Sequence, residues 1–331
     1  MSLALLRAAA KTGMGLTLLP TLYMRSGFAA QGLREDQRRF ASTPERLLLL
    51  AERIEREAAG TSTNVGLALH SLRAVDPLAL REVAAFAARK ELPVHIHIAE
   101  QMQEVDDCLA QSGQRPIEWL LTHAQPDARW NLVHATHATA EELAGVAQCG
   151  AAIVICPSTE ANLGDGVFDL PSYAAGQGRW SIGSDSHVTR NWPQELQLLE
   201  YSQRLTLRQR NVAAQVLGTE SSAAAMFEAA LAGGASATGQ ALGAIAAGQR
   251  ADFLVLDGDA PSLLGLPPDH LLDALVFSGA AGAIDQTWVA GRCVVSAGTL
   301  DADTEGHSGP VASDTAQRDA FTRAMKSLWS E

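Results

Sequence analysis

Val94-His-Ile-His-Ile-Ala-Glu100 is a short apolar run that carries two histidines and ends in a glutamate. Residues two apart on a strand share a face, so His95 and His97 can point to the same side of a sheet. A metal-dependent hydrolase needs a histidine ligand at a strand tip and a carboxylate that moves a proton, as Glu100 could. Buried, hydrogen-bonded histidines, with Glu100 as an acidic residue at a helix start, explain the same stretch equally well.

Similar apolar runs recur along the chain and alternate with helical patterns, which predicts an α/β fold with a parallel sheet. The expected strands are Leu16–Pro20, Val65–His70, Val94–Ala99, Trp130–His134, Ala152–Cys156 and Trp180–Ser184. The expected helices are Ser2–Lys11, Pro44–Ala59, Pro77–Arg89, Met102–Gln111, Pro116–Leu121, Ala140–Gln148, Gln194–Leu217 and Glu220–Ala232.

The ends of these strands favour a barrel over an open sheet. No glycine-rich phosphate turn follows the first strand, whereas polar or turn residues end the later ones. Active sites of (β/α)8 barrels lie at that rim. Because only six strands are visible, we expect a TIM-type barrel that lacks about its first two βα units. The residues at the rim are His70, His97, His134, Pro157 and Asp185.

The chain beyond the barrel predicts a smaller β module. Gly248–Asp257 has the pattern of a turn and a strand, and Trp288–Val295 that of a hairpin with Gly291 in its turn. We therefore expect an incomplete barrel over residues 1–247 and the remnant of a small β-sandwich module over residues 248–300. Residues 301–331 are expected to form a linker, polar over Asp301–Pro310, and a helix over Ala312–Trp329.

Composition limits the partners. The 331 residues are 47% hydrophobic and 19% charged, which excludes a disordered chain. A net charge of −12 argues against nucleic acid and against an anionic membrane surface. No apolar run approaches the roughly 20 residues of a membrane span. Four scattered cysteines and no signal-peptide pattern predict a cytoplasmic protein.

Three successive strand tips carry potential metal ligands. His134 alone is more often structural, and Asp185 alone is more often a helix cap. His97, His134 and Asp185 taken together favour a mononuclear metal site, with His187 outside it. Arg73, just after His70, could hold a substrate carboxylate or face solvent, and the same alternatives apply to Tyr23 and Arg25. Pro157–Gly166 is interpreted as a turn-rich loop.

The sequence resembles the amidohydrolase superfamily, and within it the formimidoylglutamate deiminase (N-formimino-L-glutamate iminohydrolase) family. The resemblance runs from the first residues to about residue 300, and two of its stretches, Ser158–Asn162 and Val188–Pro193, are particular to that family. The stretches that carry it are Leu18–Tyr23, Ser26–Phe28, Ala68–Val75, His95–Gln101, Leu132–His137, Cys156–Gly166 and Ser184–Leu196.

This resemblance implies zinc-dependent hydrolysis of N-formimino-L-glutamate to N-formyl-L-glutamate and ammonia, a step of histidine degradation. It implies one zinc ion, held in part by His97 and Asp185. Glu100 would pass a proton to the imino nitrogen, Asp185 would take the proton of water, and His134 would hydrogen-bond that water. His70 and Arg73 would hold the glutamate part of this small acidic substrate.

The resemblance also exposes a departure. The family supplies two further zinc ligands as a His-x-His pair on the first barrel strand, and no such pair precedes Leu16. We therefore expect an N-terminally truncated member whose two zinc ligands hold the ion weakly. Two open sheet edges would invite mispairing or a homodimer. A zinc aminohydrolase for a purine or pterin base and an inactive, ligand-binding remnant are the alternatives.

Overall fold

The computed structural model describes residues 1–30, 32–297, 299–300 and 314–328. A six-stranded parallel sheet forms its centre, and strands that follow one another along the chain are neighbours in it. This is the arrangement of successive βα units in a barrel. In the described residues the sheet is not closed, because β2 and β8 lie at its edges. The strands are β2 (Thr21–Leu22), β4 (Leu67–Ser71), β5 (Val94–Ile98), β6 (Trp130–His134), β7 (Ala152–Ile155) and β8 (Arg179–Ile182).

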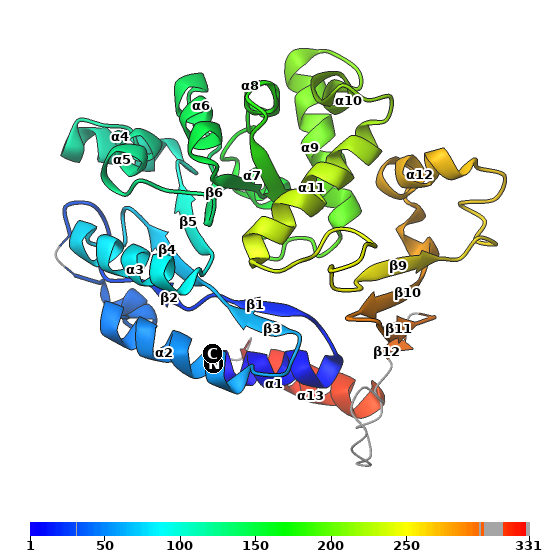
Figure 1. Cartoon of the computed structure of the whole chain (residues 1–331), viewed down its shortest axis with the longest axis horizontal. Helices are drawn as coiled ribbons and strands as arrows, with labels where there is room; N and C mark the ends of the chain where they lie inside the picture. The colour runs from blue at the N-terminus through cyan, green and yellow to red at the C-terminus, as the bar shows by residue number, and fades with distance from the viewer. Residues whose placement is uncertain (31, 298, 301–313, 329–331) are drawn as a thin grey trace.

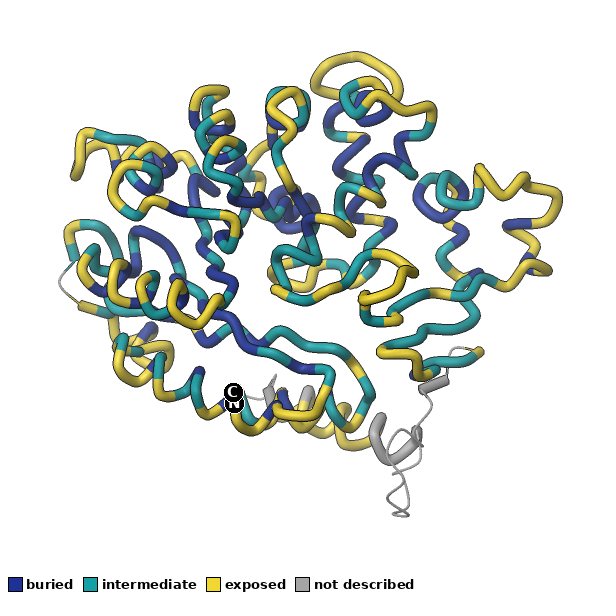
Figure 2. The backbone as a smooth tube through the Cα atoms, viewed as in Figure 1, coloured by how far each residue is buried: buried dark blue, intermediate teal, exposed yellow. Residues whose placement is uncertain are grey.

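Helices lie along the outside of this open, curved sheet, and most residues of its strands are buried or half-buried (Figures 1 and 2). Apolar residues from strands and helices form one large core, in which Ile54, Val83 and Ile96 are at most 1% exposed. Burial of these apolar faces is what places the strand ends side by side. The helices are α1 (Ser2–Thr12), α2 (Pro44–Glu57), α3 (Pro77–Lys90), α4 (Met102–Ser112), α5 (Pro116–His123), α6 (Ala140–Cys149), α7 (Pro157–Leu163), α8 (Leu170–Ala175), α9 (Trp192–Leu207), α10 (Val212–Leu217) and α11 (Ser222–Thr238).

The structure has two short strands at each of the first two expected strands, although β2 lies just beyond the expected end at Pro20. β1 (Leu16–Leu18) and β3 (Thr63–Val65) form a separate two-stranded parallel sheet, and β2 and β4 continue into the main sheet. Gly66 lies at the second break, where a Cβ atom would come within 2.9 Å of the Pro93 carbonyl oxygen. A side chain at this position would therefore push the neighbouring chain away.

Two expectations about the connections are wrong. Pro157–Gly166 is not a turn-rich loop, because residues 157–163 form α7, with Pro157 in its first turn and Gly164 as its left-handed cap (φ 74°). The helix expected over Gln194–Leu217 is two helices, and Asn211 turns the chain between them with φ 52°.

The C-terminal part contains a four-stranded antiparallel sheet in the order β12-β11-β10-β9. The expected hairpin is present, with Gly291 in its turn at φ 76°. The limits of the expected domains stay a prediction, and the expected linker over Asp301–Pro310 lies outside the described residues. None of the described helices is long and apolar enough to cross a membrane. The remaining elements are β9 (Phe253–Leu256), β10 (Ile284–Val289), β11 (Arg292–Ser296), β12 (Thr299–Leu300), α12 (Leu271–Phe277) and α13 (Asp314–Leu328), with 3-10 turns at Glu35–Phe40, Pro268–His270 and Ala280–Ala283.

Candidate functional site

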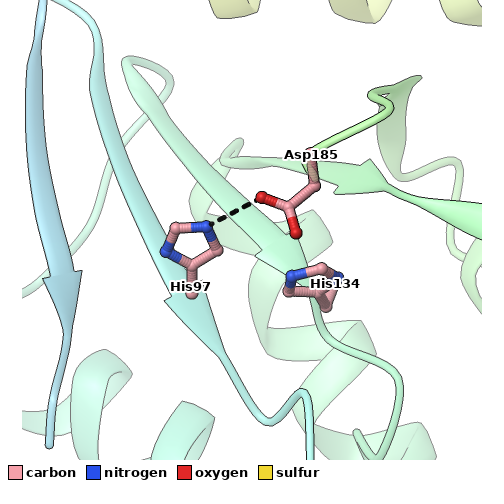
Figure 3. A group of neighbouring side chains, drawn as sticks. All are labelled: His97, His134 and Asp185. Atoms are coloured by element: carbon pink, nitrogen blue, oxygen red, sulfur yellow. Dashed lines mark ion pairs between the residues drawn. The ribbon is translucent and has the colours of Figure 1, made fainter. Parts of the chain in front are cut away.

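Three side chains from three strands meet at the carboxyl edge of the main sheet (Figure 3). His97 lies on β5, His134 is the last residue of β6, and Asp185 follows β8. One potential ligand atom of each residue lies within 4.8 Å of the others. His97 Nε2 and Asp185 Oδ1 are 3.6 Å apart. Because parallel strands end at the same edge, residues far apart in the sequence reach one point.

Hydrogen bonds fix which nitrogen of each histidine faces this point. His97 Nδ1 lies 2.8 Å from the His70 carbonyl oxygen, so this nitrogen must carry the hydrogen and donate it. His134 Nδ1 lies 3.3 Å from Glu160 Oε1, which likewise accepts. The Nε2 atoms of both rings are thus left for a further partner. Metal-binding histidines commonly have this arrangement, with the second ring nitrogen bonded to a carbonyl or carboxylate.

The donor set fits a zinc ion. Two imidazole nitrogens and one carboxylate are ligands that zinc accepts, and catalytic zinc sites have three protein ligands and one open position. The side chain of His134 is 1% exposed, whereas those of His97 and Asp185 are each 30% exposed, so solvent reaches one side of the group. His95 does not belong to it, because its Nε2 lies 2.8 Å from the Ala237 carbonyl oxygen in α11.

Burial and charge set the protonation of this group. The hydrogen bond from His97 lowers the pKa of Asp185, against the opposing effect of burial. Burial favours neutral His97, but its hydrogen bonds to Asp185 and to the His70 carbonyl outweigh burial and raise its pKa. Burial, together with the positive charges of His97 and Arg73, lowers the pKa of His70 to about 4. Asp185 is therefore an anion and His70 neutral near pH 7.

Glu100 lies beside the group. Its Oε1 is 3.6 Å from His134 Nε2, and its Oε2 is 4.0 Å from Arg73 Nη2. The residue is 9% exposed, so its carboxylate is largely shielded from water. The site therefore places one carboxylate in contact both with a potential metal ligand and with a cation.

The end of β4 contributes the residues expected to hold the substrate. The ring centre of His70 lies 5.2 Å from that of His97. The ring of Tyr23 meets the ring of His70 edge-on, with the ring centres 4.4 Å apart. The Arg73 side chain is 31% exposed and turned towards Glu100 rather than wholly into solvent. Arg25 differs from both, because its guanidinium donates to the Leu72 and Arg73 carbonyl oxygens at 2.9 and 3.1 Å. Arg25 thus holds the loop after β4 in shape.

Four residues at these strand ends have strained backbone. Ala99, His134, Ala135 and Asp185 have φ values of 50°, 73°, 53° and 48°, in the left-handed region that non-glycine residues rarely adopt. Such strain persists only where surrounding contacts enforce it, and it is common at functional sites.

Two buried glutamates at the site escaped the sequence interpretation. Glu160, in α7, binds His134, and Glu104, in the first turn of α4, accepts a hydrogen bond from the Glu100 backbone N–H. An acidic residue in the first turn of the expected helix Met102–Gln111 is a signal for the second, because such a side chain can accept a hydrogen bond from a backbone N–H just before the helix. Glu160 is not among the expected site residues because the sequence pattern predicts a loop where the structure has α7.

Comparison with known proteins gives the family. The amidohydrolase family model matches residues 2–294. Formimidoylglutamate deiminase of Pseudomonas aeruginosa is 48% identical over 302 residues, which are 90% of this chain. A 5-methylthioadenosine/S-adenosylhomocysteine deaminase of Halobacterium salinarum is 31% identical over 242 residues, or 73% of this chain. The chain spans 65% of the Pseudomonas enzyme and 55% of the Halobacterium enzyme.

Solved structures agree on the fold. The crystal structure of an amidohydrolase from Brucella melitensis has a TM-score of 0.87 and 42% identity, and the match covers 98% of this chain and 68% of that one. An adenosine deaminase from Xanthomonas campestris with bound zinc has a TM-score of 0.80 over 99% of this chain and 69% of its own, at 21% identity, which supports the fold alone. Because the family model matches residues 2–294 and the Pseudomonas relative is 48% identical, the chain belongs to the amidohydrolase family.

Proposed function

We propose that this chain hydrolyses N-formimino-L-glutamate to N-formyl-L-glutamate and ammonia. The observation that carries the proposal is the meeting of His97, His134 and Asp185 beside Glu100, with Arg73 on the other side of that glutamate. The 48% identity to a formimidoylglutamate deiminase supports the choice of substrate. In the reaction, water adds to the formimino carbon, and the C–N bond to the imino nitrogen breaks to release ammonia.

The proposed roles follow from the contacts. His97 and Asp185 hold the zinc ion, and His134 is near enough either to be a third ligand or to hydrogen-bond the attacking water. When bound, zinc lowers the pKa of a water molecule and polarises the bond under attack. Asp185 takes a proton from the water, and its carboxylate is unprotonated near pH 7, as a proton acceptor must be. Glu100 delivers a proton to the nitrogen that leaves.

Arg73 and His70 bind the glutamate part of the substrate. A guanidinium pairs well with a carboxylate through two parallel hydrogen bonds. A neutral His70, whose pKa is about 4, presents a hydrogen-bonding ring and no second positive charge near neutral pH. Arg73 thus pairs with the negative charge of the substrate, and His70 orients the substrate.

A purine-type substrate is the second candidate, because the Halobacterium relative is named as a deaminase of 5-methylthioadenosine and S-adenosylhomocysteine. The two candidates differ in charge. A carboxylate substrate needs the cation at Arg73, whereas a neutral base is bound mainly by stacking and amide hydrogen bonds. The position of Arg73 beside Glu100 supplies a cation close to the proposed proton donor, which favours the acidic substrate.

The test uses the purified 331-residue chain with added zinc. The sequence leads to the expectation of two ligands and weak zinc binding, but His134 can supply a third ligand beside His97 and Asp185. We therefore expect about one zinc ion per chain by elemental analysis, and ammonia release from N-formimino-L-glutamate but not from 5-methylthioadenosine. Ammonia from the nucleoside alone would select the second candidate. Absence of both zinc and turnover would support the inactive, ligand-binding remnant.

The cytoplasm is the proposed location, since the free cysteines form no disulfide among the described residues.

A further inference from the structure

Thr159 is a buried residue to which the proposed function gives no role. It lies in the first turn of α7, which follows β7, and it is 0% exposed. β7 pairs in parallel with β8, and Asp185 lies just after the end of β8. Because parallel strands end at the same edge, the start of α7 lies beside the turn that carries Asp185. We call residues Ser184–Ser186 the Asp185 turn.

The hydroxyl of Thr159 bonds both residues that flank Asp185. Its Oγ1 donates to the Ser184 carbonyl oxygen at 2.9 Å. The same oxygen accepts a hydrogen bond from the Ser186 backbone N–H at 3.3 Å and lies 2.8 Å from Ser186 Oγ. Since the Thr159 hydrogen points to Ser184, the Ser186 hydroxyl is the donor in the last bond. A hydroxyl offers one hydrogen and two lone pairs, so Thr159 directs its whole hydrogen-bonding capacity at the Asp185 turn.

The neighbours of Thr159 anchor the start of α7. Ser158 donates its backbone N–H and its hydroxyl to the Glu195 carboxylate of α9, at 2.9 and 2.6 Å. Glu160 lies 3.3 Å from His134 Nδ1 through Oε1. Three successive side chains of α7 thus bind α9, the Asp185 turn and β6. Because its helix is held on both sides, Thr159 can keep the Asp185 turn in a fixed place.

The Asp185 turn requires such support. Asp185 has a φ of 48°, and strain of this kind persists only where surrounding contacts enforce it. The Asp185 side chain is 30% exposed, so burial alone does not hold it. Its Oδ1 nevertheless lies 3.6 Å from His97 Nε2. The hydrogen bonds of Thr159 on either side of Asp185 supply the contacts that this backbone conformation needs.

We propose that Thr159 is a positioning residue, which fixes the Asp185 turn and so directs the Asp185 carboxylate to the point where His97 and His134 meet. This inference rests on the proposed function, in which Asp185 holds zinc. With the turn already fixed, an arriving ion need not order it. Partners that orient metal ligands commonly contribute about 10- to 100-fold to metal affinity.

Three variants separate the hydroxyl from the packing of the side chain. Thr159→Val replaces the hydroxyl with a methyl group of similar size, and Thr159→Ser keeps the hydroxyl but loses the methyl group. Thr63→Val is the matched control, because Thr63 is also buried (8%) but lies in β3, in the separate two-stranded sheet. If Thr159 only packs, Thr159→Val will behave like the wild type.

The first measurement uses the metal-free 331-residue chain labelled with 15N-serine. Ser186→Ala identifies the Ser186 backbone N–H signal. We expect the hydrogen exchange of this amide to accelerate about tenfold or more in Thr159→Val, and to stay near the wild-type rate in Thr159→Ser and Thr63→Val. Melting temperatures confirm that each variant is folded. Unchanged exchange in Thr159→Val would overturn the proposal, because the turn would then be fixed without the hydroxyl.

The second measurement is zinc affinity, by competition with a chromogenic chelator. We expect Thr159→Val to bind zinc about tenfold or more weakly, and Thr159→Ser and Thr63→Val to bind it like the wild type. Unchanged zinc affinity in Thr159→Val would overturn the positioning role, as would an equal loss in Thr159→Ser. If the wild type binds no zinc, the proposed function fails, and the exchange of the Ser186 amide still decides whether Thr159 fixes the Asp185 turn.

Discussion

Arg73 is proposed to bind the substrate carboxylate, and it also lies beside Glu100, the proposed proton donor. Its guanidinium is near Glu100 without forming a close pair, since Nη2 and Oε2 are 4.0 Å apart. We expect Arg73→Ala to raise KM for N-formimino-L-glutamate more than it lowers kcat. Loss of a charge-assisted, two-point contact costs about 1.5–3 kcal/mol, or roughly 10- to 150-fold. Steady-state kinetics on the zinc-loaded chain measure both constants. An unchanged KM would mean that Arg73 does not bind the substrate carboxylate and only faces solvent.

Glu100 is predicted to act on the rate and not on the metal. Its carboxylate contacts His134 but does not belong to the group of potential ligands. We expect Glu100→Gln to retain the zinc content of the wild type and to lose about 10²–10⁴-fold in ammonia release, the usual value of a positioned proton donor. Elemental analysis and an ammonia assay on one preparation test this. A variant that loses its zinc would show that Glu100 is a ligand.

The residues at the rim could be predicted because each ends an apolar run. His97, His134 and Asp185 follow strands whose pattern is plain in the sequence, and the fold brings their ends together. The supporting glutamates could not be predicted in the same way. Glu160 binds His134, which becomes its neighbour only when helix and strand pack, and a single sequence carries no signal for such a tertiary contact. The contact of Glu104 with the Glu100 backbone is local, so its spacing is visible in the sequence, but the burial of the Glu104 carboxylate is not.

Among the elements, α11 packs most closely against the edge of the main sheet. A Cβ atom on Gly233 would lie 1.8 Å from the Trp180 carbonyl oxygen of β8, whereas one on the next residue, Gly234, would meet nothing within 4 Å. The same substitution therefore has opposite expected effects. Gly233→Ala should lower the free energy of unfolding by about 1–3 kcal/mol through overpacking. Gly234→Ala should raise it by up to about 1 kcal/mol through helix propensity.

Urea unfolding of both variants tests the packing of α11. Because the two glycines are adjacent in one helix, each variant controls for the helix propensity gained by the other. Equal stabilisation by both substitutions would mean that α11 does not lie against β8 in solution. The measurement needs neither metal nor substrate, so it is independent of the proposed activity.

Element boundaries show where sequence patterns were sufficient. β6 matches its expectation at both ends, because a polar loop precedes Trp130 and the rim begins at His134. The loop expected over Pro157–Gly166 is a helix, although a first-turn proline and a glycine just past the end are both ordinary helix signals. The division of the first strand was not visible. It depends on β1 and β3 pairing away from the main sheet.

At the scale of the whole molecule, the main sheet has two edges in the described residues. β2 and β8 are the edges of the main sheet in the described residues, and α11 packs against β8. The edge at β2 is only two residues long, which limits pairing with another chain. We propose that a homodimer uses the β2 edge of the sheet despite its shortness, since α11 packs against β8 at the other edge.

The candidate metal centre joins three strands of the main sheet. His97, His134 and Asp185 come from β5, β6 and the end of β8, so an ion held by all three resists separation of these strands. A ligand that binds only the folded state stabilises it, by about 2.7 kcal/mol at 100 times its dissociation constant. We expect zinc to raise the melting temperature of the chain and EDTA to reverse the rise.

Two variants decide whether that stabilisation arises at this site. Asp185→Asn keeps the shape of the side chain but removes the charge that a metal requires, so the zinc-dependent shift should be lost or greatly reduced. His123→Gln removes an exposed histidine of α5 and should leave the shift intact. Were the shift to survive in Asp185→Asn and vanish in His123→Gln, zinc would be bound at the surface. The three strand ends would then meet for the sake of packing alone.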